Sequence, residues 1–263
     1  MTLENVADDP LVAVCTNGRR IHVAANDLRG VRLRECAGNL NPLSLKAWQR
    51  LAASAWTDIV DVGANYGEML LNIDVPLAVR CVAVEPNPLL AALLRRSIAD
   101  AGLEIPVVEK ALGRADGTLP LLVDETWSGL SKLGAEPHAE SQGHTVRSLD
   151  VAVTTLAALI DDGTPLKEKR VLVKLDVEGW ECDVLRGLHG VGDALADLVI
   201  FLEVHHLGQA DIDWLVSRFQ PEVFDPATGA FTPIQGDGRR LAAVLATRAF
   251  HSQDIALRRR PQR

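Results

Sequence analysis

Short apolar runs and amphipathic segments alternate along most of the chain. Apolar runs that end in turn residues are typical of buried strands, and apolar positions spaced by three or four residues are typical of helices. The expected strands are 58–62, 79–84, 105–109, 171–175 and 198–204, and the expected helices are 42–55, 88–101, 153–160, 181–188 and 212–219, with a short helix from residue 69. Because strands and helices follow one another in repeated units, the pattern predicts an α/β fold with a mostly parallel sheet and helices on both faces.

Three segments depart from this alternation. Asn17-Gly18 lies between apolar runs in residues 11–36, which predicts an N-terminal β-hairpin. Residues 113–149 are rich in glycine and contain one apolar run, which favours a hairpin or an irregular insertion over one edge of the sheet. Residues 223–225 and 241–246, separated by proline and glycine, predict a terminal antiparallel hairpin that completes a seven-stranded sheet.

These elements imply one principal domain with additions at both ends. We expect a cap of hairpin and helix over residues 1–55, a main domain over 56–250 that includes the insertion, and a basic tail over 251–263 that is frayed from Arg258 to Arg263. A length of 263 residues suits one large domain. Residues 1–10 lack the apolar run of a signal peptide, and no stretch approaches the roughly 20 apolar residues of a membrane span, so the expected location is the cytoplasm.

Composition argues against several classes of protein. The formal net charge is −8, which disfavours a general nucleic-acid binder. The 4 cysteines are widely spaced and form no CxxC pair, so we expect neither a structural zinc site nor a disulfide framework. Aromatic residues make up 4% of the chain, which leaves a core of alanine, valine and leucine, as suits a parallel sheet covered by helices.

Polar residues follow directly after the first two expected strands. Asp61-Val62-Gly63-Ala64-Asn65-Tyr66-Gly67 combines an acidic residue with a glycine turn that lacks the GxGxxG pattern, which favours a ligand with an ammonium group or several hydroxyls over a pyrophosphate. Glu85-Pro86-Asn87 places a carboxylate at the spacing where a carboxylate binds ribose hydroxyls. Ligands bind at the carboxyl ends of such strands, so both segments are candidate binding residues.

Charged residues also follow the fourth and fifth expected strands. Lys174-Leu175-Asp176-Val177-Glu178-Gly179-Trp180-Glu181 brings several charges to the end of an otherwise apolar strand, and Glu203-Val204-His205-His206 adds polar groups at the same edge. Because central parallel strands are normally buried and uncharged, we expect these residues to bind a ligand or to take part in catalysis.

The segments DVGANYG, VEPNP and VKLDVEGWE, the last followed by VLRGL, resemble the FkbM-type family of S-adenosylmethionine-dependent methyltransferases. The resemblance runs from about residue 56 to residue 206 and does not cover the N-terminal hairpin or the tail. It implies a Rossmann-like class I methyltransferase fold with a terminal antiparallel strand, and O-methylation of small molecules or sugars. We therefore expect an O-methyltransferase that acts on a hydroxyl of a sugar, a polyketide or another small metabolite.

The residues and the resemblance agree on how S-adenosylmethionine would bind. Asp61 and the turn of Gly63, Ala64, Asn65, Tyr66 and Gly67 would hold the methionine part, and Glu85 would hold the ribose, with Pro86 fixing the turn. Asn87 and Lys110-Ala111 would border the adenine, and the resemblance puts Asp176 beside the donor methyl. Glu178 and Trp180 would face the acceptor, and Trp127 of the insertion would form part of the acceptor wall.

Methyl transfer to a hydroxyl also needs a group that takes the proton. His205 is the first candidate for this base because an unshifted histidine titrates near neutrality, and Asp176 and Glu178 are alternatives. By alternation, His206 is expected to point the other way and to be structural. A third alternative is a divalent ion held by Asp176, Glu178 or Glu203 together with His205, which would lower the pKa of a coordinated hydroxyl.

Two other functions stay open on sequence alone. One is a nucleotide-dependent oxidoreductase on a similar sheet, which the lack of GxGxxG disfavours. The other is a catalytically silent protein that binds the cofactor. In every case the expected partner is a small molecule rather than nucleic acid or a membrane, and the sequence leaves the formation of a homo-oligomer open.

Overall fold

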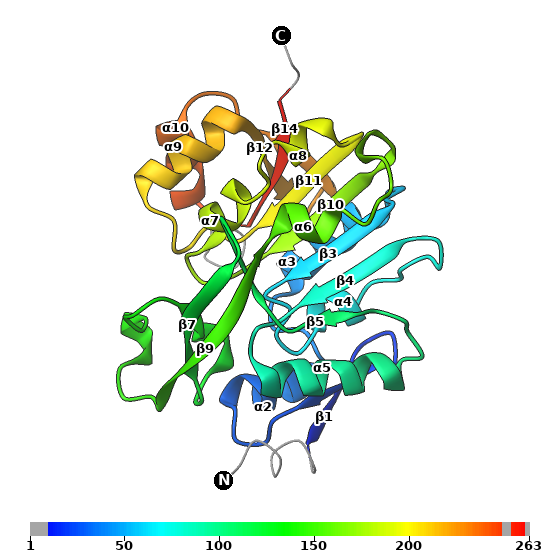
Figure 1. Ribbon diagram of the computed structural model, residues 1–263, viewed down its shortest axis with the longest axis vertical. Helices are drawn as coiled ribbons and strands as arrows, with labels where there is room; N and C mark the ends of the chain where they lie inside the picture. Colours follow the sequence, from blue (N-terminus) through cyan, green and yellow to red (C-terminus); the bar gives the residue numbers. More distant parts are fainter. Residues whose placement is uncertain (1–9, 249–253, 261–263) are drawn as a thin grey trace.

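The structure, a computed structural model, describes residues 10–248 and 254–260 of the chain. Its main sheet has eight strands in the order β13-β12-β14-β11-β10-β3-β4-β5 (Figure 1). The bounds are β13 (Ala230–Pro233), β12 (Phe219–Asp225), β14 (Ile255–Arg259), β11 (Asp197–Leu202), β10 (Arg170–Leu175), β3 (Asp58–Val62), β4 (Arg80–Val84) and β5 (Val107–Val108). Strands β11, β10, β3, β4 and β5 are parallel to one another, which confirms the expected α/β sheet.

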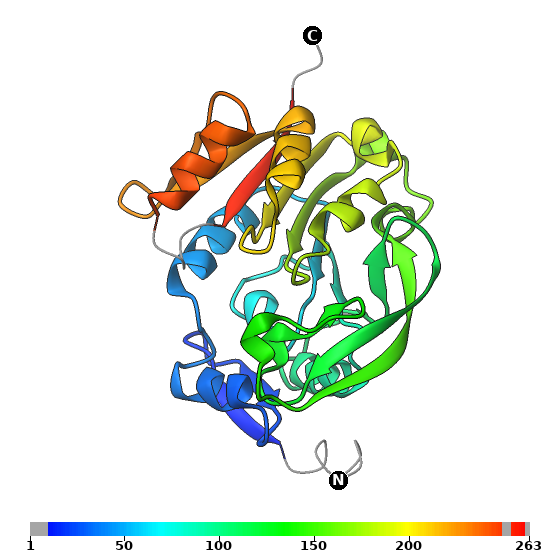
Figure 2. The ribbon, with the colours of Figure 1, turned by 90° about the vertical axis from the view of Figure 1, so that its left-hand side faces the viewer.

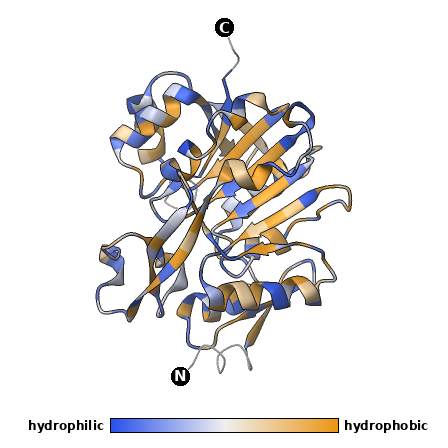
Figure 3. Cartoon of the chain, in the orientation of Figure 1, coloured by the Kyte–Doolittle hydropathy of each residue, from blue (hydrophilic) through white to orange (hydrophobic). Residues whose placement is uncertain are grey.

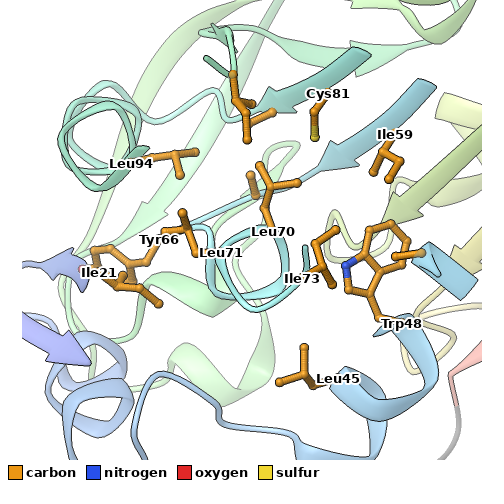
Figure 4. Packing of buried hydrophobic residues seen from close by; sticks show 14 of the residues in the cluster. Ile21, Leu45, Trp48, Ile59, Tyr66, Leu70, Leu71, Ile73, Cys81 and Leu94 are labelled. Atoms are coloured by element: carbon orange, nitrogen blue, oxygen red, sulfur yellow. The ribbon is translucent and has the colours of Figure 1, made fainter. Parts of the chain in front are cut away.

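Helices cover both faces of this sheet, and successive strand residues point into two separate cores. Ile59 of β3 belongs to one core and Val60 to the other. The first core receives α3 (Pro42–Ala52), α4 (Glu68–Leu71) and α5 (Pro88–Asp100); Figure 4 shows Trp48, Tyr66 and Leu70 packed there. The second receives α6 (Leu156–Ile160), α7 (Glu181–Arg186), α9 (Gln209–Arg218) and α10 (Gly238–Ala246), and α8 (Val191–Ala194) lies beside it. The central strands are accordingly the most continuously apolar elements (Figure 3).

The chain begins with the hairpin that the Asn-Gly pair predicts. Strands β1 (Leu11–Val14) and β2 (Arg20–Val23) are antiparallel, and Gly18 in the turn has a φ of +83°. A helix that the sequence pattern does not reveal, α2 (Leu28–Glu35), follows, and the side chain of Asp27 accepts a hydrogen bond from the amide of Arg29 at its first turn. Helix α5 packs against β2, so the hairpin extends the first core outward (Figure 1).

The insertion is a second, four-stranded sheet rather than a simple hairpin. Its order is β6-β9-β7-β8, with β6 (Ala111–Gly113), β7 (Gly117–Asp124), β8 (Lys132–Leu133) and β9 (Val146–Thr155), and it stands as its own layer in Figure 2. Short 3₁₀ turns occur at Ser128–Leu130, Ala139–Ser141 and Leu166–Glu168. The helix expected over 153–160 begins only at Leu156, because the β-branched residues before it continue strand β9.

The C-terminal region differs from the prediction in two ways. Residues 241–246 lie in helix α10, and β12 pairs instead with β13 and β14, which gives eight strands in place of seven. The tail is not frayed over its described part, because β14 is inserted antiparallel between β11 and β12. Its residues Ile255, Ala256 and Leu257 are fully buried, and Arg258 pairs with Glu222. The apolar stretch 255–257 is short and lies next to the arginine run, so the sequence pattern does not predict a strand there.

The expectations for residues 1–9, 249–253 and 261–263 lie outside the described residues. Across 10–248 and 254–260, no helix combines the length and the apolar character that crossing a lipid bilayer requires.

Candidate functional site

A cavity of about 310 Å³ opens where β3, β4, β10 and β11 end, and the insertion lies over it. This is the position at which open parallel sheets bind their ligands. The polar residues from the strand ends that line it are Asn65, Glu85, Asp176, Glu178, Glu203, His205 and His206. Gly63, Pro86, Lys110 and Ala111 line it as well, so four separate predicted segments meet at one site.

The turn after β3 depends on a glycine at position 63. Gly63 has a φ of +73°, and a Cβ built on it would lie 1.8 Å from the carbonyl oxygen of Asp176. The main chain of the β3 turn therefore passes directly against the main chain that follows β10. This close approach brings Asn65 and Asp176 to the same cavity.

Glu85 is held by hydrogen bonds from two turns that the sequence predicts to bind the same ligand, the turn after β3 and the turn after β4. One of its carboxylate oxygens accepts a hydrogen bond from the amide of Asn65 at 2.8 Å, and the other accepts from the amide of Asn87 at 2.9 Å. The residue is only 5% exposed, and this burial raises its pKa to about 7 in spite of the two donors. Each oxygen keeps a further lone pair, so the ionised carboxylate can accept hydrogen bonds from two hydroxyls of a ligand.

Several predicted cofactor residues support the site from beneath rather than line it. Ala64, Tyr66, Gly67 and Asn87 are buried. The hydroxyl of Tyr66 donates to Asp27 at 2.6 Å, Gly67 allows close packing by α5, and Asn87 caps that helix by accepting from the amide of Leu89. These residues therefore fix the shape of the turns, and the residues next to them line the cavity.

Asp61 and Lys174 form a buried charged pair beneath the Gly63 turn. The Nζ of Lys174 lies 3.8 Å from Oδ1 of Asp61 and 3.0 Å from Oδ2 of Asp176. Asp61 is 0% exposed, and its burial raises its pKa to about 6 although the charge of Lys174 opposes this. Neither carboxylate oxygen of Asp61 has a hydrogen-bond partner among the described residues. A cationic ligand close by would stabilise the ionised carboxylate of Asp61.

Asp176 and Glu203 both line the cavity, and their pKa values are shifted in opposite directions. Burial disfavours the ionised form of Asp176, but the charge of Lys174 and a hydrogen bond from Glu203 outweigh it and hold the pKa of Asp176 at about 2. Burial and the charge of Asp176 raise the pKa of Glu203 well above its usual value. The two carboxyl groups thus have opposite pKa shifts, which favours the ionised form at Asp176 and the protonated form at Glu203.

Both adjacent histidines line the cavity, so the expectation that His206 points away is wrong. Strand β11 ends at Leu202, and the alternation of side chains does not continue into the turn that carries the histidines. The side chain of His205 is 7% exposed, and its Nε2 lies 3.5 Å from Oε1 of Glu203. Ligand atoms of Asp176, Glu178 and Glu203 lie within 4.8 Å of one another, which brings together three of the four predicted metal ligands.

The two tryptophans singled out by the sequence differ in position. Trp127 lines the cavity from the insertion. Trp180 does not line it: its ring packs against both the second core and the core of the insertion sheet. Trp180 thus joins the two layers.

Arg29 is the principal cavity residue that the sequence pattern does not reveal. It comes from α2, donates to Oδ1 of Asn65 at 2.9 Å and forms a salt bridge with Glu68. Ser128, Lys132 and Glu140 of the insertion line the cavity too. These residues lie far along the chain from the strand ends, and no local pattern marks them.

Comparisons with known proteins agree with this architecture. Residues 61–224 match the family model described as the methyltransferase FkbM domain, which is more than half of the chain. Methyltransferase sdnD of Sordaria araneosa is 33% identical over 156 residues, which span 49% of this chain and 60% of that protein. The chain thus covers less than two thirds of that relative.

Solved structures with a similar fold are more distant in sequence. An S-adenosylmethionine-dependent O-methyltransferase from Thermotoga maritima is 10% identical, with a TM-score of 0.42 over 99% of this chain and 82% of that one. The O-methyltransferase TomG from Streptomyces achromogenes is 14% identical, with a TM-score of 0.38 over 88% and 86%. The family match covers the glycine turn, Glu85 and the charged ends of β10 and β11, and the chain belongs to the FkbM family of S-adenosylmethionine-dependent methyltransferases.

Proposed function

We propose that this protein transfers a methyl group from S-adenosylmethionine to a hydroxyl of a small-molecule acceptor such as a sugar or a polyketide. The observation that carries the proposal is the composition of the cavity of about 310 Å³ at the strand ends. It has a buried carboxylate, Glu85, on one wall and the group of Asp176, Glu203 and His205 on another. The first suits a ribose, and the second suits a cationic centre beside a group that accepts a proton.

The residues present fit the cofactor. Glu85 would accept hydrogen bonds from the ribose hydroxyls, with Pro86, Lys110 and Ala111 beside the base. The negative charge of Asp176, and the buried carboxylate of Asp61, whose oxygens accept no hydrogen bond from the described residues, suit a ligand that carries positive charge. When bound, S-adenosylmethionine supplies an electrophilic methyl group on a sulfonium.

The chain's own residues would align the acceptor and take its proton. His205 is the proposed base: its largely buried side chain lines the cavity, and Glu203 lies beside its Nε2. As the acceptor oxygen forms its bond to the methyl carbon, the carbon–sulfur bond breaks with its electron pair left on sulfur, and His205 takes the hydroxyl proton. Trp127 would form part of the wall against which the acceptor lies.

Isothermal titration with S-adenosylhomocysteine tests the cofactor half of the proposal, and a screen for transfer of labelled methyl to hydroxylated metabolites tests the other half. We expect binding by the unmodified protein and transfer to at least one sugar or polyketide. Absence of cofactor binding would overturn the proposal as a whole. Binding without any transfer across the screen would instead support a catalytically silent cofactor-binding protein.

The raised pKa of Glu85 predicts a pH dependence of cofactor binding. The carboxylate accepts from ribose hydroxyls best when ionised, and its pKa in the free protein is about 7. The dissociation constant for S-adenosylhomocysteine should therefore fall by about tenfold between pH 6 and pH 8 as Glu85 ionises. Glu85→Gln should bind more weakly and lose most of this dependence, measured by the same titration at both pH values. A pH dependence that persists unchanged in Glu85→Gln would assign it to another group.

A further inference from the structure

A histidine of the insertion meets two polar residues of the main domain at the edge of the cavity. His138 precedes the 3₁₀ turn at 139–141, Glu178 follows β10, and His206 follows β11. The Nε2 atoms of His138 and His206 lie 3.4 Å and 2.7 Å from Oε2 of Glu178. The two imidazole rings have their centroids 4.5 Å apart.

One of the convergent atoms is buried and has no hydrogen bond. The side chain of His138 is 8% exposed, and its Nε2 has no hydrogen-bond partner among the described residues. Oε2 of Glu178, toward which both histidines point, pairs with Nε2 of His206 at 2.7 Å, so the atom left without a partner in the described part of the chain is Nε2 of His138. Buried polar atoms in native proteins are nearly always paired, so this group lacks a component that would satisfy it.

The missing component has the chemistry of a divalent transition-metal ion. One possible ligand atom from each of the three residues lies within 4.8 Å of the others. Two imidazole nitrogens and one carboxylate oxygen form a ligand set typical of zinc sites that keep an open position. Zinc–nitrogen bonds of about 2.0–2.1 Å at tetrahedral angles place neighbouring ligand atoms about 3.3 Å apart. The 3.4 Å separation of His138 from Glu178 agrees with this value, and a small rotation of His206 would open its 2.7 Å contact.

The other clusters of ligating residues in the described part of the chain are less suited to such an ion. One consists of carboxylates alone, Asp176, Glu178 and Glu203, and another combines His205 with Glu203 and Asp254. In the first, Asp176 already forms a salt bridge with Lys174, whose Nζ lies 3.0 Å from its Oδ2. Of these clusters, the one containing His138 is the one with two imidazoles.

We propose that His138, Glu178 and His206 bind a divalent transition-metal ion of the zinc class that ties the insertion to the main domain. Glu178 and His206 line the cavity, so a coordination position left open would face it. An acceptor oxygen or a water molecule could occupy that position; this last point rests on the proposed function, whereas the site itself does not.

Cobalt(II) titration of chelator-treated protein tests the site through its visible absorption, without any need for activity. We expect one equivalent to bind with the strong d–d bands of a tetrahedral site. His138→Ala and His206→Ala should each weaken binding by more than about 100-fold, since even the loss of an outer partner costs 10–100-fold. His189→Asn is the matched control, because His189 lies outside the cavity and its partner is the carbonyl of Arg114, so its affinity should not change.

His138→Cys gives a second readout that does not depend on losing affinity. A thiolate in place of the imidazole should add a sulfur-to-cobalt charge-transfer band, which appears only if residue 138 is a ligand. Unchanged cobalt affinity in His138→Ala, or the absence of this band in a His138→Cys protein that binds cobalt, would overturn the site. S-adenosylhomocysteine binding is measured on the same samples. If the unmodified protein does not bind it, the proposed function is refuted, and the cobalt spectra still decide the metal site.

Discussion

Replacing Gly63 by alanine is expected to destabilise the protein by at least about 4 kcal/mol, at the upper end of single-substitution effects. The new Cβ would lie 1.8 Å from the carbonyl oxygen of Asp176, so one of two main-chain segments must move. Both segments carry cavity residues, Asn65 on one and Asp176 on the other. The variant should therefore also lose S-adenosylhomocysteine binding, and urea denaturation with isothermal titration measures the two effects.

Gly102→Ala separates the steric clash from the cost of the backbone conformation. Gly102 has a φ of +65°, close to that of Gly63, but no atom lies within 4 Å of a Cβ built there. An alanine in left-handed conformation costs about 1–2 kcal/mol, and that is the whole effect expected for Gly102→Ala. Gly63→Ala and Gly102→Ala could instead prove equally stable. The close approach of the two main-chain segments would then not be the reason for glycine at position 63.

The second large effect is expected on catalysis. His205→Asn should lower kcat for methyl transfer by about 100-fold or more, because general bases contribute about 10²–10⁴ to the rate. The side chain lines the cavity beside Glu203, whereas Glu85 is held by the amides of Asn65 and Asn87, so the affinity for S-adenosylhomocysteine should stay unchanged. The test is single-turnover transfer of labelled methyl to the acceptor that the metabolite screen identifies.

His189→Asn serves as the control for this variant too. His189 has a φ of +45°, a conformation that asparagine tolerates better than most residues, so the substitution removes an imidazole without adding strain. Its kcat should match that of the unmodified protein. A full rate in His205→Asn would falsify the assignment of His205 as the base and direct attention to Asp176 or Glu178.

The part of the site that sequence predicts is the part built from local turns. The glycine turn and Glu85 are each fixed by a few consecutive residues, and the sheet then brings their strand ends together. Lys174, Asp176 and Glu203 stand out for the same reason, since charges at the ends of apolar strands are visible along the chain. For these residues, the α/β pattern alone predicts that they lie close together at the strand ends, as they do in the structure.

The residues that sequence does not predict reach the cavity by tertiary packing. Arg29 lies on a short polar helix whose contact with Asn65 depends on how the N-terminal hairpin packs against α5. His138 meets Glu178 and His206 only because the insertion sheet folds over the strand ends. Trp180 lies beside a turn that lines the cavity, but its own side chain packs against the core of the insertion and does not line that cavity.

The position of β14 has a consequence for the order in which the protein can be assembled. The hairpin of β12 and β13 is attached to the rest of the main sheet through β14, the last strand in sequence. While the chain is being synthesised, β11 exposes an unpaired edge until residues 255–259 have emerged. The main sheet is therefore completed only after synthesis has passed that strand, and deletion of it would separate the β12–β13 hairpin from the sheet that carries the cavity.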